Sequence, residues 1–196
     1  MYLEPNTDPR WFEQAPKVEL HLHLEGAIPL PILWDLLQKY GGDPAVSSIE
    51  KLAGLFVYRD FAHFVKAWSW KSQWLREYDD FELLAEAVAQ DLVRQNVRYA
   101  EVFYSPPDYL DAGLEPQRLT AAIRRGIGKV ANIEIALVAD LVRDEGPERG
   151  ARLLECIQEV RDLGVNRRRH RRFGTSFPAR GIRFGLPEGA CVRLPY

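Results

Sequence analysis

Cysteine is scarce in this chain of 196 residues, which has only Cys156 and Cys191. Two thiols form neither a disulfide framework nor a cysteine-based metal site, so we expect both to be reduced. Uninterrupted apolar runs of roughly 18 to 20 residues, the length of a membrane span, are also missing. The N-terminus lacks the basic-then-apolar order of a signal peptide. These absences predict a cytoplasmic protein without a membrane partner.

The composition is that of a globular protein, with 46% apolar and 28% charged residues. Its net charge of -2 conceals two unlike parts. Residues 166–196 contain eight Arg and one acid, which leaves 18 of the 26 basic and 27 of the 28 acidic residues in residues 1–165. We therefore treat residues 1–165 as an acidic body and 166–196 as a basic tail.

Residues 17–24 alternate between apolar and polar side chains, which predicts a β-strand. One side carries Val18, Leu20, Leu22 and Leu24, and the other carries Glu19, His21 and His23.

Helical and strand patterns alternate along the rest of the body. We expect helices at 31–40, 48–75, 81–96, 117–131 and 147–163, strands at 97–104 and 133–140, and a fourth strand that begins at Gly164. Asp79 is the expected N-cap of the helix at 81–96. This order predicts parallel β/α units, in either a barrel or a doubly wound sheet. A barrel needs eight strands and about 250 residues, so the chain supplies only part of one.

His21 and His23 stand two residues apart on the first strand, so their imidazoles project to the same side. Such a pair is within reach of one metal ion, and imidazole suits zinc, iron, nickel or copper. A catalytic site would need one or two further ligands. The alternative is two histidines that face solvent or are satisfied in the core. Their position at the end of the first strand, just before Gly26, favours the metal hypothesis.

The segment PKVELHLHLEGAI at 16–28 resembles the first-strand signature of the adenosine deaminase family, and VRYAEVFYSP at 97–106 resembles its second strand. The resemblance implies an incomplete TIM (β/α)8 barrel of the metal-dependent hydrolase type, with three to four β/α units plus extra lid helices. It also implies that His21, His23, a later histidine and a later aspartate hold zinc. Metal-activated water would then attack C6 of a purine and release ammonia.

The same resemblance implies substrate contacts at His23, Glu25, Phe64 and Trp68. Glu25 stands where the family usually has an aspartate that contacts the ribose, which leaves adenosine, adenine and aminofutalosine open as substrates. The plainer interpretation of Glu25 is an acid at a helix N-terminus, where the helix dipole favours a negative charge. Phe64 and Trp68 resemble the aromatic pair of the lid helix, although aromatic residues at this spacing more often form core. His63 is expected to be a surface or core-satisfied residue.

Four polar residues end the second and third strands, where substrate contacts or helix caps are both common. They are Tyr99, Glu101, Ser105 and Asp140.

The tail at 166–196 shows neither strand nor helix periodicity, and its arginines are incompatible with a buried fourth strand. One explanation is an RNA-binding extension. The explanation that we favour is a shifted reading frame, because G+C-rich codons displaced by one base permit VGIGGSEHRSPPEAFGSAYRRARAFGFR, which looks like the missing fourth strand, loop and helix. We then expect a disordered tail and no nucleic-acid partner.

The family's H-A-G-E motif, proton-handling histidine and aspartate ligand would lie beyond the break, and His170 matches none of them. We therefore expect no catalytic residue in this chain and no activity. Its expected partner is a small purine nucleoside or base, and the oligomeric state stays open. The alternatives are a partial α/β domain that binds RNA through its arginines, or another H-x-H metal hydrolase.

Overall fold

The computed structural model describes residues 10–140 and 146–162, without the side chains of 158–162. The expected fourth strand and the basic tail, with His170 and Cys191, lie outside the described residues.

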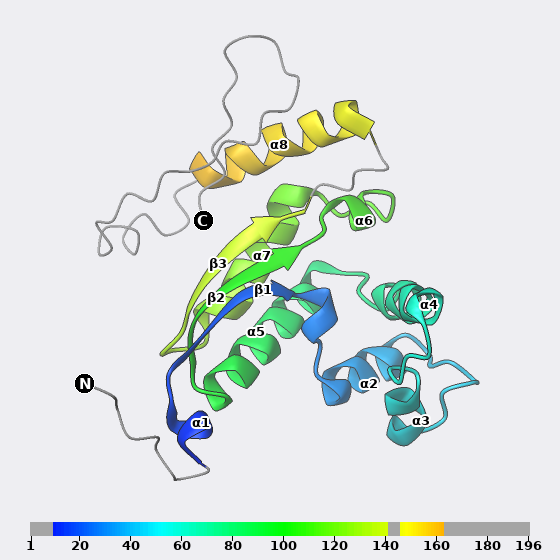
Figure 1. Ribbon diagram of the computed structural model, residues 1–196. Coiled ribbons are helices and arrows are strands. Elements are labelled where there is room, and N and C mark those ends of the chain that lie inside the picture. The colour runs from blue at the N-terminus through cyan, green and yellow to red at the C-terminus, as the bar shows by residue number, and fades with distance from the viewer. Residues whose placement is uncertain (1–9, 141–145, 163–196) are drawn as a thin grey trace.

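The described strands form one parallel sheet in the order β1-β2-β3 (Figure 1). They are β1 (Lys17–His23), β2 (Val97–Tyr104) and β3 (Glu134–Ala139), which confirms the three predicted strands within one residue at either end. The chain therefore has an α/β fold, and the carboxyl ends of all three strands meet at one edge of the sheet. Hydrogen bonds from Leu24 N to Phe103 O and from Asp140 N to Tyr104 O continue the pairing past that edge.

Helices connect and cover the strands (Figure 1). They are α1 (Trp11–Gln14), the 3-10 helix η1 (Glu25–Ala27), α2 (Leu30–Lys39), α3 (Ile49–Gly54), α4 (Phe61–Ser72), α5 (Tyr78–Arg94), α6 (Pro107–Leu110), α7 (Pro116–Gly128) and α8 (Gly146–Asp162). The helices α5 and α7 pack against each other on one face of the sheet, whereas α2, α3 and α4 lie beyond the carboxyl end of β1. Thus α5 and α7 form a layer that covers the sheet, and α2, α3 and α4 form a group beside the strand ends.

The helical segment expected at 48–75 is interrupted, because the structure has two helices there. Each begins at its own N-cap: Ser48 Oγ accepts from Lys51 N at 3.3 Å, and Asp60 Oδ1 accepts from His63 N at 2.7 Å. The aromatic residues between the two caps continue an apolar pattern without continuing the helix. The second cap, at Asp60, therefore outweighed the periodicity on which the prediction rested.

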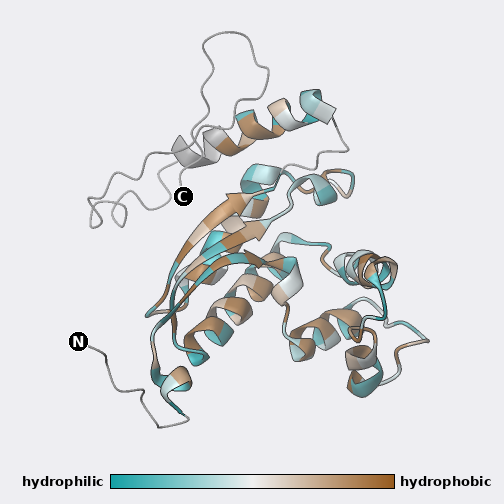
Figure 2. Cartoon of the chain, in the orientation of Figure 1, coloured by the Kyte–Doolittle hydropathy of each residue, from teal (hydrophilic) through white to brown (hydrophobic). Residues whose placement is uncertain are grey.

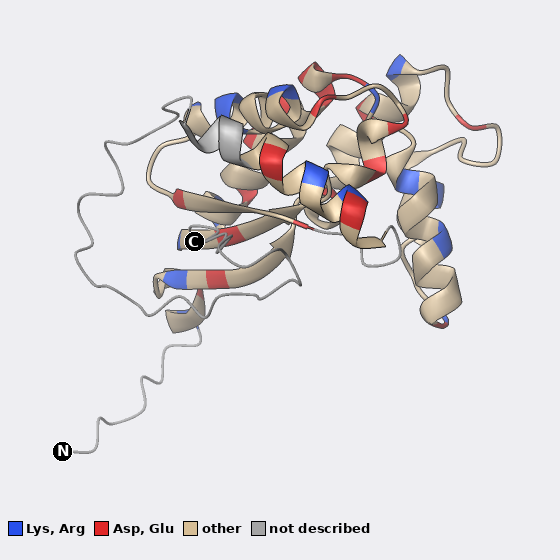
Figure 3. Ribbon diagram, turned by 90° about the horizontal axis from the view of Figure 1, so that it is seen from above, with Lys and Arg blue, Asp and Glu red and all other residues tan. Residues whose placement is uncertain are grey.

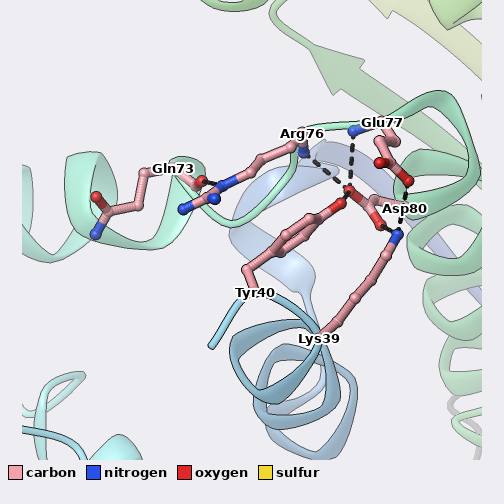
Figure 4. Close-up of polar contacts among 6 residues, drawn as sticks. All are labelled: Lys39, Tyr40, Gln73, Arg76, Glu77 and Asp80. Carbon is pink, nitrogen blue, oxygen red and sulfur yellow. Dashed lines mark hydrogen bonds and ion pairs between the residues drawn. The ribbon is translucent and has the colours of Figure 1, made fainter. Parts of the chain in front are cut away.

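The prediction that Asp79 is the N-cap of α5 is wrong, because the helix begins at Tyr78 and its N-cap is Glu77. The buried neighbour Asp80 completes the capping box by accepting from Glu77 N at 2.9 Å. Its carboxylate also accepts from Lys39 Nζ at 2.7 Å and Tyr40 Oη at 2.5 Å, both at the end of α2 (Figure 4). Asp80 therefore caps one helix and ties it to another.

The core lies between the sheet and the α5–α7 layer and extends to α2 and α3, and apolar residues concentrate on β2, β3 and the inner sides of the helices (Figure 2). Its fully buried members include Phe81, Leu84, Val102, Leu119 and Ile123. Acidic and basic residues are interspersed over the helices (Figure 3). For example, Glu82 of α5 pairs with Arg125 and Lys129 at 2.7 and 3.0 Å.

The first strand lies at an edge of the described sheet, and its apolar side is only partly covered. Val18 and Leu20 are 60% and 59% exposed, whereas Leu24 is 1% exposed. The pairing with β2 shifts register between Glu19 and Leu22, where β1 has one extra residue. Thus β1 joins the core mainly through its carboxyl end.

Candidate functional site

The two histidines of β1 lie side by side at the carboxyl edge of the sheet. The ring centroids of His21 and His23 are 5.3 Å apart. Both rings pack on Phe103 of β2, at centroid distances of 4.4 and 5.5 Å. Because strand side chains alternate, Phe103 faces away from the buried Val102 and the helix layer. The structure therefore places both imidazoles together on a phenylalanine platform.

Asp140, directly after β3, brings a carboxylate to the histidine pair. Its Oδ2 lies 3.3 Å from His23 Nδ1, although the geometry is not that of a hydrogen bond. Ser105 Oγ donates to the same oxygen at 3.3 Å. Burial raises the pKa of Asp140, against the opposing effect of His23. Two of the four expected strand-end residues thus come together beside His23.

The other two strand-end residues contact each other. Tyr99 Oη donates to Glu101 Oε1 at 3.2 Å along β2. Burial, followed by the charge of Glu101, raises the pKa of Tyr99 to about 12. A substrate role for Tyr99 and Glu101 stays a prediction.

Glu25 lies in η1, immediately after β1, and is 1% exposed. Ser105 N donates to its Oε1 at 3.0 Å, while Oε2 is buried without a partner among the described residues. Burial raises the pKa of this carboxyl to about 7, despite the backbone hydrogen bonds that lower it. A helix-dipole role alone does not explain so complete a burial.

Trp68 of α4 lies against one of the two histidines. Its ring meets that of His23 edge-on at 5.9 Å and lies 6.0 Å from Phe64. A Cβ atom at Gly26 would lie only 3.2 Å from the Trp68 ring, so glycine permits this close approach. Phe64 and Trp68 are both half-buried, which keeps the core and lid interpretations open. His63 accepts from Arg59 N at 3.3 Å, as expected of a locally satisfied histidine.

Lys71 and Tyr109 were missed at the sequence level. Lys71 is 4% exposed, and its Nζ lies 3.9 Å from the centroid of the Trp68 ring. Burial lowers its pKa to about 8, against the attraction of Glu25. Tyr109 is 3% exposed, and burial raises its pKa. A lysine near the end of an amphipathic helix usually reaches solvent, so its sequence position gave no signal of burial.

The described residues do not complete a metal site. In residues 10–140 and 146–162, no group of three His, Cys, Asp or Glu side chains is arranged to hold a metal ion. The imidazoles of His21 and His23 fit a zinc site in donor type and spacing, but further ligands would have to come from elsewhere. Cys156 is a free thiol in α8.

Two open hollows of about 290 and 440 Å³ lie away from the histidines. The smaller is formed by the α2–α3 turn and the larger by the segment around α6 together with Cys156. Neither involves the residues around His23, so they do not bear on its chemistry. In the described part of the chain, no helix has the length and apolarity needed to cross a membrane.

Comparison with known proteins points to one family. The family model described as adenosine deaminase matches residues 16–167. An adenine deaminase of Mesorhizobium japonicum is 35% identical over 135 residues, which are 67% of this chain and 41% of that protein. An aminodeoxyfutalosine deaminase of Streptomyces avermitilis is 31% identical over 173 residues, which are 88% of this chain and 47% of that protein.

A solved structure agrees with these relatives. An amidohydrolase of Burkholderia ambifaria with bound zinc superposes with a TM-score of 0.65 and 25% identity, over 81% of this chain and 45% of that one. The chain therefore spans less than half the length of each of these proteins.

Proposed function

This chain belongs to the adenosine deaminase family, and we propose that it is the N-terminal part of a metal-dependent purine deaminase. The observation that carries the proposal is the pair of imidazoles, His21 and His23, held 5.3 Å apart on Phe103 at the carboxyl edge of a parallel sheet. In (β/α) barrels, this edge is where active sites form.

The three parallel strands and their helices would be the first units of a TIM (β/α)8 barrel within residues 1–165. The group α2, α3 and α4 would form the lid beside the strand ends. The relatives are more than twice as long as the segments that match, in agreement with a partial barrel. Residues 166–196 would be a basic segment foreign to the fold.

His21 and His23 would hold a zinc ion, together with ligands outside the described residues. Zinc lowers the pKa of bound water enough to supply hydroxide near neutral pH. Asp140 lies beside Nδ1 of His23, so it would hold that nitrogen and leave Nε2 for the metal. Phe103 would keep both rings in place.

His23, Glu25, Phe64 and Trp68 would contact the substrate. Trp68 and Phe64 would cover the purine, and the unpartnered Oε2 of Glu25 would accept a hydrogen bond from it. Adenosine, adenine and an aminofutalosine-type nucleoside are the candidate substrates. The relatives named for adenine and aminodeoxyfutalosine favour the latter two. Neither the family match nor these relatives supports the RNA-binding alternative.

Zinc titration of the purified full chain tests the metal proposal. We expect weak zinc binding that His21→Ala and His23→Ala reduce further, whereas the control His63→Ala leaves it unchanged. Equal binding by all four proteins would refute the assignment of His21 and His23.

An ammonia-release assay with the three candidate substrates tests whether the chain itself is active. We expect no deamination by these 196 residues, because the later acid-base residues that the family resemblance implies would lie beyond the matched segment at 16–167. Zinc-dependent release of ammonia would overturn that expectation.

Resequencing the gene across the codons for residues 160–175 tests the frameshift, which predicts one inserted or deleted base.

A further inference from the structure

Ser105 stands where the ends of the three strands meet, and each of its polar groups has a partner. It directly follows β2 and is 7% exposed. Its backbone N–H donates to Glu25 Oε1 at 3.0 Å, and its Oγ donates to Asp140 Oδ2 at 3.3 Å. Its carbonyl oxygen accepts from Asp108 N at 3.2 Å. One residue thus bonds to the segment after β1, to the residue after β3 and to α6.

The backbone of Ser105 is fixed independently of the hydroxyl. Pro106 follows it, and the residue before a proline is restricted to extended conformations. The bond to the buried Glu25 holds the N–H side of Ser105, and the bond from Asp108 holds its carbonyl side. The hydroxyl that donates to Asp140 is therefore kept in place by groups other than Asp140 itself.

Asp140 in turn lies beside a nitrogen of His23 that has no hydrogen-bond partner in the described structure. The Nδ1 atom of His23 is buried, and Asp140 Oδ2 lies 3.3 Å from it. A neutral imidazole carries one proton, on either Nδ1 or Nε2. A carboxylate oxygen beside Nδ1 repels the lone pair of an unprotonated nitrogen and attracts an N–H group. The position of Asp140 therefore favours the tautomer with a proton on Nδ1 and a free lone pair on Nε2.

We propose that Ser105 is a positioning residue of this site, whose hydroxyl holds the Asp140 carboxylate where it selects the Nδ1–H tautomer of His23. The free lone pair of Nε2 is then available to a metal ion, because a metal-bound imidazole must offer an unprotonated nitrogen. In this role Ser105 acts only through Asp140. The inference rests on the proposed metal-dependent function and adds a residue that orients one of the two proposed ligands.

Two other histidines serve as internal references. His63 Nδ1 accepts from Arg59 N at 3.3 Å, so its proton belongs on Nε2, the opposite tautomer. His21 shares β1 and its aromatic platform with His23, but within the described residues Asp140 pairs with His23 alone. A general loosening of the site would affect His21 and His23 alike, whereas loss of the serine hydroxyl should affect only His23.

Nitrogen-15 NMR of the imidazole rings in the zinc-free full chain tests the inference. At about pH 8.5, where an imidazole is neutral, the ¹⁵N shifts identify the protonated nitrogen of each ring. We expect His23, assigned with His23→Gln, to be mostly Nδ1–H, and His63 to be mostly Nε2–H. The variant Ser105→Ala removes only the hydroxyl, because the backbone N–H that donates to Glu25 remains.

We expect Ser105→Ala to shift the tautomer ratio of His23 about threefold toward Nε2–H, the effect of a weakened hydrogen bond. The ratios of His21 and His63 should stay unchanged in this variant. Asp140→Asn should shift the ratio of His23 further, because the amide carries no negative charge and can donate to an unprotonated Nδ1.

The control Ser69→Ala, which removes an exposed hydroxyl from α4, should leave the His23 ratio unchanged. Four results overturn the inference: a wild-type His23 that is mostly Nε2–H, a His23 ratio unchanged in Ser105→Ala or in Asp140→Asn, equal shifts of His21 and His23 in Ser105→Ala, or the same shift of His23 in the Ser69→Ala control.

Zinc affinity separates this inference from the proposed function. Loss of the group that orients a metal-bound imidazole costs about ten- to a hundredfold in affinity, which we expect for Asp140→Asn, with a smaller loss for Ser105→Ala. If zinc binds through His21 and His23 but the His23 ratio does not depend on Ser105, the positioning role fails and the metal proposal stands. If the ratio depends on Ser105 but the histidine variants bind zinc as well as wild type, the metal proposal fails and the positioning role stands.

Discussion

The Lys39 ammonium donates to the buried Asp80 carboxylate at 2.7 Å, and this contact joins the end of α2 to the first turn of α5. The Asp80 side chain is 1% exposed and that of Lys39 is 42% exposed, so solvent screens only one partner. Tyr40 Oη and the backbone N–H groups of Arg76 and Glu77 donate to the other carboxylate oxygen of Asp80 (Figure 4). The helix α2 is thereby fastened to α5, which belongs to the helix layer of the sheet.

Replacing Asp80 with alanine should destabilise the chain by about 2 to 4 kcal/mol, because it leaves two backbone N–H groups and the Tyr40 hydroxyl without their acceptor. The measurement is urea unfolding followed by far-UV circular dichroism. Asp79→Ala is the matched control, since Asp79 is exposed in the same turn and should change stability by less than about 0.5 kcal/mol. Equal effects of the two substitutions would refute the role of Asp80.

The stability of the chain should fall in acid through the same carboxylate. Burial would raise the pKa of Asp80, but the hydrogen bonds from Lys39, Tyr40 and the backbone outweigh it and hold the pKa below its usual value. A lowered folded-state pKa stabilises the protein above the unfolded pKa of about 3.9, and the contribution disappears as the pH falls through the folded value. Urea unfolding between pH 7 and 3 should show a smaller loss in Asp80→Asn than in wild type. Parallel curves would contradict the prediction.

Gly126 sets the distance between α5 and α7. A Cβ atom at this position would overlap the Glu82 carbonyl oxygen of α5, which is backbone and cannot rotate away. Gly126→Ala should therefore destabilise the chain by about 1 to 3 kcal/mol through overpacking, despite the better helix propensity of alanine. Gly128→Ala provides the control, since nothing lies within 4 Å of its added Cβ, and it should be neutral or slightly stabilising. Thermal unfolding of both variants measures the difference.

The parallel α/β fold could be predicted because its signals are local. Alternating apolar residues marked β1, and the three strands with long helices between them fixed the class. The break between α3 and α4 was missed because the aromatic residues around Tyr58 continue an apolar pattern, while the deciding signal was the single cap at Asp60. The capping residue of α5 was missed for a similar reason, since several acids in succession can each serve as a cap.

The candidate site, like the fold, has a part that the sequence predicted and a part that it did not. The spacing of His21 and His23 follows from one strand, so the sequence predicted their proximity. The position of Asp140 beside His23 depends on the register of three strands, and the burial of Lys71 depends on how α4 packs near η1. Such contacts join residues far apart in the chain, and no periodicity encodes them. Only the structure could show that Glu25 and Lys71 are both buried.

Gly26 controls how closely α4 approaches the histidines. In Gly26→Ala, the new methyl group would meet the Trp68 ring at 3.2 Å and the His23 Cβ at 3.4 Å, so the ring has to move by a few tenths of an ångström or more. We expect Trp68 to leave its edge-on contact with His23, with a loss of about 1 to 2 kcal/mol of stability. In protein labelled with 5-fluorotryptophan, the ¹⁹F resonance of Trp68, assigned by its absence in Trp68→Phe, should shift, whereas that of Trp34 should not. Gly54→Ala, with open space around its Cβ, is the control. An unchanged Trp68 resonance in Gly26→Ala would show that α4 yields without loss of the contact, and that the absence of a Cβ atom at Gly26 is not what allows the ring to pack there.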